Sequence, residues 1–503
     1  MRLNKKYCLA LTIFVFVLIY GHSCNVKKEG QDIAEKACSS CHMCPDPGDL
    51  DKKTWTEAVL PRMGARLGVE DYGILVLDAG VYSVDDLPKE GIIIPEEAVI
   101  TQEEWAQVKK YFIENAPEKL KHSTPLFELP LAYLRPTIKK LTGYKEKADN
   151  TLIKISEKSD RVFIGGRDGK LTIYNKRLEK LDSLQFESAP TALHEEENGN
   201  LHVLLVGNIA PNNRKSGSLV KVDSIGKQTT VIQGLMRPVF MEVHDFNGDG
   251  KQEFLIGSFG FSLGHLAIYS LKENGEYDEK VLIEAPGAVK AIVTQDQKDQ
   301  LPEIMVMMAQ ANEAIHLLTN KGNLEFKDSI IMKYAPNYGS SDMLWEDING
   351  DGYRDLVVCH GDNADYTNIK KPYHGIRVYL ASGKLKFGPP VFYPLDGASR
   401  LLAADFDNDG KKDIMVASYF ADFVNSPGNG LVMLKQKEKG KFEFHHIPGA
   451  DQGRWLIMDT GDLNGDGKPD LIAGSHIAGM MVDPKTLETW MGEHTDFLTL
   501  KGI

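Results

Sequence analysis

Residues 347–355 read Asp-Ile-Asn-Gly-Asp-Gly-Tyr-Arg-Asp, and the apolar run Leu-Val-Val-Cys follows them directly. This stretch decides the predicted fold. Oxygen-bearing side chains stand at positions 1, 3, 5 and 9 of the loop, and the glycine at position 6 permits a sharp turn. With a backbone carbonyl at position 7, these oxygens can surround a hard cation, so the stretch predicts a calcium loop that leads into a buried strand.

Three further loops have the same spacing, and each also precedes a short apolar run. The first half of the pattern resembles an EF-hand loop, but position 12 is never glutamate and β-type runs flank the loops instead of helices. Four copies make a solvated turn without a ligand an unlikely alternative. The residues expected to bind calcium are Asp245, Asn247, Asp249 and Glu253; Asp347, Asn349, Asp351 and Asp355; Asp405, Asp407, Asp409 and Asp413; and Asp462, Asn464, Asp466 and Asp470.

The loops belong to a longer internal repeat. Three degenerate copies, near residues 153, 194 and 295, precede similar apolar runs, and the seven copies follow one another at intervals of 41 to 58 residues. That period fits a four-stranded unit, and seven such units close a ring. The sequence therefore predicts an all-β, seven-bladed propeller over residues 140–503. It resembles the FG-GAP (VCBS) repeats of the integrin α-subunit propeller, in which calcium loops occupy only some blades. We expect structural calcium that fixes the turn between the first two strands of a blade.

A cysteine cluster near the N-terminus, Cys38-Ser-Ser-Cys41-His42-Met-Cys44, points to a cofactor. Cys-x-x-Cys-His is the attachment pattern of haem c: the thiols of Cys38 and Cys41 bond the porphyrin, and His42 is the proximal iron ligand. A redox dithiol or half a zinc site are the alternatives. The flanks have helical spacing, which disfavours a redox dithiol. A zinc site would need a second Cys/His pair nearby, and none follows before His122.

Helical periodicity surrounds the haem motif. The last helical segment begins with Thr101 and has Glu104 three residues later, which predicts a capping box. We expect a small all-α cytochrome c-like domain over residues 24–118, whose last helix resembles the C-terminal helix of class I cytochromes c. The segments with helical spacing are residues 30–41, 54–65 and 101–115.

The sixth haem ligand is expected to be Met63, the one methionine between Met43 and Met236. Class I cytochromes place this methionine just before the last helix, which Met63 does not match. His122 is the rival ligand, and Cys44 is interpreted as a free thiol near the haem edge.

The N-terminus has the features of an export signal. A basic start precedes an apolar run of 14 residues, from Tyr7 to Tyr20, which is too short to span a bilayer as a helix. Residues 1–23 therefore predict a signal peptide. The tetrapeptide that ends at Cys24 resembles the lipobox of bacterial lipoproteins, which implies lipidation of Cys24 and anchoring in the cell envelope. Ordinary cleavage beside an incidental cysteine is the alternative.

Composition narrows the range of functions. The chain is 42% hydrophobic and 26% charged, as expected for a globular protein, and its formal charge of −13 argues against nucleic-acid binding. Residues 119–139 are rich in proline and predict a linker between domains.

Loops on the propeller face opposite the calcium loops are candidates for binding. The longest carries His360, Asp362, Tyr366, Lys371 and His374, side chains suited to a small, sugar-like substrate or to the haem domain itself. A solvated rim without a ligand is the alternative. Basic residues that are expected to ring the axial channel, either for an anionic group or by chance, are Arg237, Lys290, Arg400 and Arg454.

Two functions of different class remain. The chain resembles the bacterial (Bacteroidetes-like) c-type cytochrome/FG-GAP (VCBS) repeat lipoproteins, which implies haem-based electron transfer with a propeller that binds a substrate or a redox partner. The alternative is a cell-envelope module that binds glycans or proteins and has an accessory haem. Whether the chain is an oxidoreductase stays open, since the sequence contains no Ser-His-Asp elbow, nucleotide loop or HExxH pattern.

Overall fold

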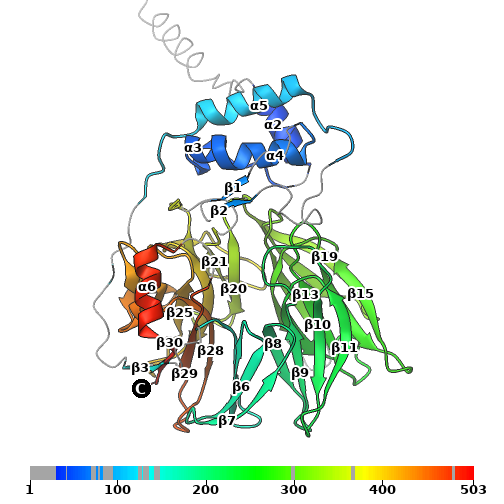
Figure 1. Cartoon of the computed structure of the whole chain (residues 1–503), viewed down its shortest axis with the longest axis vertical. Coiled ribbons are helices and arrows are strands. Elements are labelled where there is room, and N and C mark those ends of the chain that lie inside the picture. Colours follow the sequence, from blue (N-terminus) through cyan, green and yellow to red (C-terminus); the bar gives the residue numbers. More distant parts are fainter. Residues whose placement is uncertain are drawn as a thin grey trace, which may run out of the picture.

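The structure is a computed structural model. It describes residues 30–40, 42–69, 75–77, 80–82, 95–122, 127, 135–140, 148–295, 301–363, 369–478 and 482–502. Seven four-stranded antiparallel sheets are arranged as the blades of a propeller (Figure 1). The predicted seven-bladed propeller is confirmed.

In the first six blades the strands follow one another along the chain from the inner to the outer edge. The first three blades consist of β4 (Asn150–Ser156), β5 (Arg161–Gly166), β6 (Lys170–Asn175) and β7 (Lys180–Gln185); β8 (Pro190–Glu195), β9 (Leu201–Leu205), β10 (Gly217–Val222) and β11 (Gln228–Leu235); and β12 (Pro238–His244), β13 (Glu253–Ser258), β14 (His265–Leu271) and β15 (Tyr277–Ile283). The next three consist of β16 (Ala288–Thr294), β17 (Glu303–Met308), β18 (Ala314–Asn320) and β19 (Phe326–Lys333); β20 (Ser340–Glu346), β21 (Asp355–His360), β22 (Gly375–Tyr379) and β23 (Val391–Pro394); and β24 (Ala398–Ala404), β25 (Asp413–Ser418), β26 (Leu431–Glu438) and β27 (Lys441–His446).

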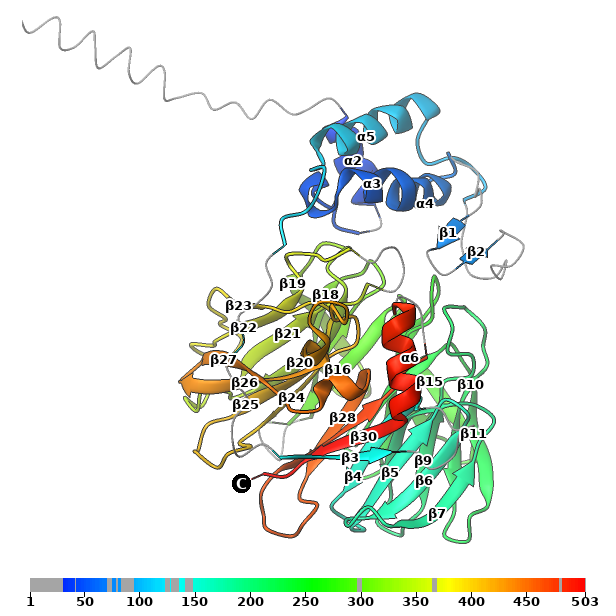
Figure 2. The same cartoon turned by 60° about the vertical axis from the view of Figure 1, so that its left-hand side comes forward.

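The seventh blade joins the two ends of the propeller. Its inner strands are β28 (Trp455–Gly461), β29 (Asp470–Ser475) and β30 (Thr495–Leu500), and its outer strand is β3 (Pro136–Lys140). β3 pairs antiparallel with β30, with Ile138 opposite Leu498, so that an early and a late segment lie side by side (Figure 2). The ring is therefore closed by backbone hydrogen bonds.

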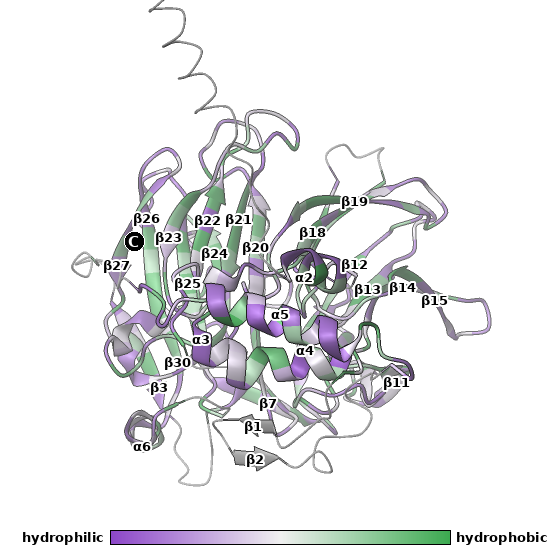
Figure 3. Ribbon diagram, turned by 90° about the horizontal axis from the view of Figure 1, so that it is seen from above, coloured by the Kyte–Doolittle hydropathy of each residue, from purple (hydrophilic) through white to green (hydrophobic). Residues whose placement is uncertain are grey.

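Burial explains why the central residues of the second strands are apolar. β21 and β25 are buried along their whole length, because each blade packs on a neighbour with both faces. A hydrophobic cluster fills each interface between blades; in one of them Val357 and Cys359 pack with Val416 of the next blade. The view from above shows apolar colour concentrated in the strands (Figure 3).

The innermost strands share a β-bulge directly after their first residue, which in β12 lies between Pro238 and Phe240. The hydroxyl of the bulge residue Thr151 donates to the carbonyl of Pro190 at 2.8 Å. Thr191 donates in the same way to Pro238 at 3.0 Å. These bonds link the inner strands of neighbouring blades.

Short helices precede the propeller and lie over one of its faces (Figures 1 and 3). The predicted capping box is confirmed, because Thr101 Oγ1 accepts from Glu104 N and the Glu104 carboxylate accepts from Thr101 N. Trp55, Trp105 and Phe112 form the core of this region. Its elements are α2 (Gln31–Cys38), a 3₁₀ turn (Pro47–Asp49), α3 (Lys52–Thr54), a π turn (Trp55–Val59), α4 (Leu60–Arg66), β1 (Leu75–Leu77), β2 (Gly80–Tyr82) and α5 (Gln102–Asn115).

The prediction of a small all-α cytochrome c-like domain is wrong. Among the described residues, the α-helices before the propeller span only 8, 3, 7 and 14 residues, and the sheet of β1 and β2 lies between α4 and α5 in the chain. Pro61 has no amide hydrogen to donate, and the helix widens into a π turn just before it. Helical spacing in three segments therefore did not imply a sizeable all-α unit.

Few other helical elements interrupt the described part of the propeller. α6 (Pro484–Glu493) is inserted between β29 and β30, and its Trp490 packs on Phe423 with ring centroids 4.8 Å apart. Two 3₁₀ turns are Pro427–Gly430 and Ala450–Gln452. No helix among the described residues has the length and apolar character needed to cross a membrane. The expected signal peptide and Cys24 lie outside the described residues.

Candidate functional site

The four acidic loops lie where the sequence predicts, between the first and second strands of blades three, five, six and seven. In the loop of blade three, Asp245 accepts hydrogen bonds from the amides of Gly248 and Gly250 at 2.6 and 2.8 Å. The first aspartates of the other loops accept equivalent bonds. These bonds shape each loop into a tight turn whose remaining carboxylates converge.

The ninth residue of each loop is the first residue of a buried strand. Asp355, Asp413 and Asp470 are fully buried, and Glu253 is 2% exposed. Burial raises the pKa of each of these carboxyls, in Asp413 to about 7, and the neighbouring loop carboxylates raise them further. A bound cation would reverse this effect by favouring the charged form.

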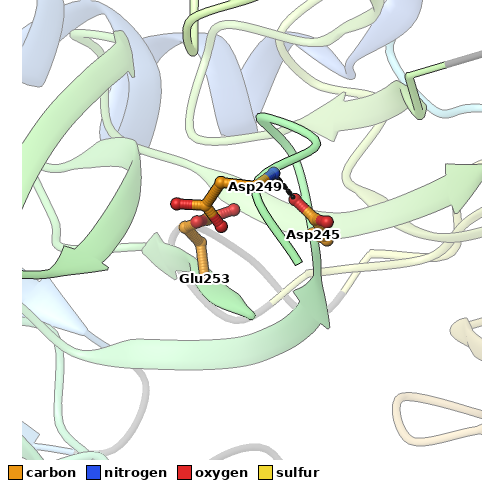
Figure 4. A group of neighbouring side chains, drawn as sticks. All are labelled: Asp245, Asp249 and Glu253. Carbon is orange, nitrogen blue, oxygen red and sulfur yellow. Dashed lines mark hydrogen bonds between the residues drawn. The ribbon is translucent and has the colours of Figure 1, made fainter. Parts of the chain in front are cut away.

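In two of the four loops, carboxylate oxygen atoms meet closely enough to share an ion. Asp245, Asp249 and Glu253, drawn in Figure 4, each have an oxygen within 4.8 Å of the others, and the same holds for Asp405, Asp407 and Asp409. Within the described structure, Asp413 Oδ2 and Asn349 Oδ1 are buried atoms without a hydrogen-bond partner. An all-oxygen donor set with such unpartnered atoms fits calcium.

The Cys/His segment follows α2. Cys38 is the last residue of this helix, and Cys41 lies outside the described residues. The Nδ1 atom of His42 lies 2.8 Å from the carbonyl oxygen of Met43, which leaves Nε2 free of that contact. Burial lowers the pKa of His42. A neutral imidazole held through Nδ1–H presents the lone pair of Nε2, the form that ligates iron, so His42 fits a haem ligand.

The neighbouring sulfur atoms differ from expectation in one respect. Cys44, interpreted as a thiol without a partner, hydrogen-bonds Cys38; this bond lowers the pKa of Cys38 and raises that of Cys44. Met63 lies on α4 and packs, half-buried, against the core around Trp55. The rival ligand His122 contacts a propeller loop instead, with Nε2 3.0 Å from Asp396 Oδ1.

The residues predicted to line the binding rim lie close together, but they are largely buried. His360, His374 and Lys371 are at most 6% exposed, Asp362 is half-buried, and Tyr366 lies outside the described residues. Burial lowers the pKa of both histidines well below its usual value, so their rings are neutral. Both Nε2 atoms are buried and have no hydrogen-bond partner among the residues that the structure describes.

An aromatic cluster, unseen in the sequence, surrounds these histidines. The centroid of the His360 ring lies 4.4 Å from that of Tyr334 and 5.3 Å from that of Tyr338. Tyr338 stacks on Tyr373, with ring centroids 4.7 Å apart. Tyr334 and Tyr338 belong to the connection between two blades, which reaches the same face as the long loop. Connections between blades could therefore have been counted among the candidate binding loops, because Ala-Pro-Asn-Tyr-Gly at 335–339 is a clear turn signal in the sequence.

The cover of this rim is the N-terminal region. Tyr373 Oη donates to the carbonyl of Asp49 at 3.1 Å, and Asn337 Nδ2 donates to Tyr373 Oη at 2.6 Å. Ile369 packs against the helical core. After α5, the chain is held at His122 by Asp396, and at Phe127, whose ring stacks on His446 at 4.7 Å.

A cavity of about 10 Å³ remains beside the rim, with room for roughly one water molecule. It is far too small for a sugar. Its lining residues are His122, Lys371, Pro372, His374, Pro394, Leu395 and Asp396.

The four basic residues expected at the axial channel have separate partners. Arg454 is fully buried over the ring of Tyr419, 3.6 Å from its centroid, and Arg237 donates to the carbonyl of Gly260. Lys290 Nζ lies 3.8 Å from Asp342 Oδ1, and Arg400 reaches the carbonyl of Ser341. These contacts give no common anion site.

Comparisons with known proteins show no family for this chain. No protein-family model matches the chain, and no curated protein matches it. Similar solved structures include the crystal structure of BBS1N in complex with ARL6DN soaked with mercury, at 11% identity, covering 73% of this chain and 96% of that chain, with a TM-score of 0.44. The lead-soaked form of that complex gives 11% identity, 72% and 96% coverage, and a TM-score of 0.43. At this identity and TM-score the similarity supports no conclusion about function.

Proposed function

We propose that this chain is an exported, lipid-anchored electron-transfer protein of the cell envelope. In this proposal, haem c is attached through Cys38 and Cys41 with His42 as proximal ligand, and Cys24 carries the lipid. The helices around the haem segment dock on a propeller stabilised by calcium. When bound, the haem supplies a one-electron carrier.

The orientation of His42 carries the proposal. Its Nδ1 faces the carbonyl of Met43 at 2.8 Å, an arrangement that fixes the tautomer and directs Nε2 to a metal. In a Cys-x-x-Cys-His segment, that is the requirement for a proximal ligand. Met63, on the neighbouring α4, is the sixth ligand that we propose.

The covered rim supports docking of the N-terminal region over binding of a sugar-like substrate. His360 and His374 are buried beneath Tyr338, Tyr373 and the contact with Asp49. The adjacent cavity holds about one water molecule. We infer that the propeller positions the haem-bearing helices, and that its remaining surface is available to a redox partner.

Calcium has a structural role in this proposal. The loop carboxylates repel one another, and the buried ninth residues are costly to ionise without a counter-charge. Calcium in the four loops removes both penalties and fixes the first turn of four blades.

The test is to produce the full chain together with a cytochrome c maturation system and to extract it with acid–acetone. Haem should remain with the protein and give a pyridine haemochrome spectrum of the thioether type. The C38A/C41A variant should lose it, whereas C44A, which alters the third thiol of the same cluster, should keep it. Haem that is never acquired, or that passes into the solvent, overturns the proposal.

A second measurement separates electron transfer from catalysis. The ascorbate-reduced protein should be reoxidised by an added soluble redox protein, and the oxidised protein should not be reduced by sugars or alcohols. Reduction by a sugar that disappears in the H360A/H374A variant would instead establish an enzyme.

A further inference from the structure

The third acidic loop differs from the other three in charge. Its third position is Asp407, where the other loops have Asn247, Asn349 and Asn464. This loop therefore has four carboxylates, and each of the others has three. The additional negative charge lies at a position that is expected to ligate calcium.

A lysine from the adjacent strand compensates for this charge. Lys435, on β26, contacts Asp407 Oδ2 through Nζ and lies 3.6 Å from Asp409 Oδ2. The side chains of Lys435 and Asp407 are only 13% and 10% exposed. The ammonium group thus reaches two of the oxygens that would bind a cation.

The strand register shows that, of the four loops, only the third has a largely buried lysine at this position. Lys435 directly follows Leu434, which pairs with Ile414. The corresponding residues in the other three blades are Ser270, Leu380 and Lys501, and Lys501 is exposed. Lys411 also contacts Asp409, but it is more exposed, and lysines occupy the same loop position in two of the other loops, so it does not distinguish this one.

The third loop nevertheless keeps a feature that favours a cation. Asp413 is fully buried, and among the described residues its Oδ2 has no hydrogen-bond partner. Lys435 therefore neutralises the outer carboxylates without satisfying the innermost one.

We propose that Lys435 is an internal cation that competes with calcium for the third loop, so that this loop binds calcium more weakly than the other three. Calcium enters by displacing the ammonium group from Asp407 and Asp409. The inference rests on the proposed calcium sites and adds a difference in calcium affinity among them.

The test is a titration of the calcium-depleted full chain with calcium chloride, followed by calorimetry and by metal analysis after equilibrium dialysis. Wild type should show three similar sites and one that is about tenfold weaker, since ligand charge sets the affinity of such loops. The K435M variant should tighten the weak site by about the same factor. K501M, altered at the equivalent position beside the fourth loop, should leave all four sites unchanged.

The D407N/K435S variant gives the third loop the residues found at these two positions in blade three, and it remains testable if K435M does not fold. It should also bind four calcium ions with similar affinity. Four equal sites in wild type, or an unchanged weak site in both variants, overturns the role of Lys435 and leaves calcium binding intact. Absence of calcium binding in every variant overturns the calcium proposal together with this one.

Discussion

The hydroxyl of Tyr373 donates a hydrogen bond to the carbonyl of Asp49, 324 positions earlier in the chain. This bond joins the 3₁₀ turn beside the cysteine cluster to the rim of blade five. Asn337 supports it from the connection between blades, through its own bonds to the Tyr373 hydroxyl and to the Asp49 side chain. The orientation of the N-terminal helices on the propeller therefore depends on a few polar contacts around one tyrosine.

Replacing Tyr373 by phenylalanine should loosen this docking without unfolding the propeller. The lost hydrogen bond is worth about 1 kcal/mol, so the undocked population should rise roughly fivefold. Protease cleavage within residues 119–139 should accelerate by a similar factor. Y353F, at an exposed tyrosine of a calcium loop, is the control. Equal cleavage rates in Y373F and wild type would contradict the role of the bond.

Replacing Met63 by leucine should change the haem spectrum while the haem stays covalently attached. Loss of a thioether ligand abolishes the charge-transfer band of methionine ligation and lowers the reduction potential. H122A should leave both properties unchanged, because His122 is engaged by Asp396. If H122A removes the band and M63L does not, the ligand assignment is reversed.

Removal of calcium should lower the melting temperature of the propeller. A single site contributes about 2.7 kcal/mol when free calcium is one hundred times its Kd. D351A should lose part of the difference between calcium and chelator, whereas D182A, at an exposed residue of β7, should keep all of it. Identical melting curves in calcium and in excess chelator would rule out a structural role.

Stability should also fall as pH rises from about 4.3, the value for an unperturbed glutamate, toward 8. Burial raises the pKa of Glu313, which lies close to the docking rim, to about 8, although Ser340 donates to its carboxylate at 3.0 Å. Between these pH values the folded state holds a proton that the unfolded state has released, so the free energy of unfolding decreases with pH. E313Q should flatten the dependence of melting temperature on pH, and the surface variant E273Q should not. An unchanged slope in E313Q would assign it to other groups.

The propeller could be predicted because its signal is local and repeated. Each acidic loop has oxygen-bearing residues at fixed spacing, and each leads into a strand that is buried on both faces, as in β21 and β25. The wrong prediction concerned the N-terminal region, because helical spacing in three segments does not by itself imply an all-α domain. Pro61 and the sheet of β1 and β2 limit that region to short helices.

The site was predictable in its residues and not in its surroundings. His360, Lys371 and His374 do lie together, but their burial depends on Tyr338, Tyr373 and Asp49, which are distant in sequence. The pairing of Lys435 with Asp407 likewise depends on the register of two strands. Such contacts leave no periodic trace in a single sequence.

The pairing of β3 with β30 determines when the ring can close. β30 follows every other described strand in the chain, so β3 has to wait for all of the blades between them to be synthesised before it can pair. Until then the circle of blades stays open. Under the export that we propose, the ring could close only after both β3 and β30 have left the cytoplasm.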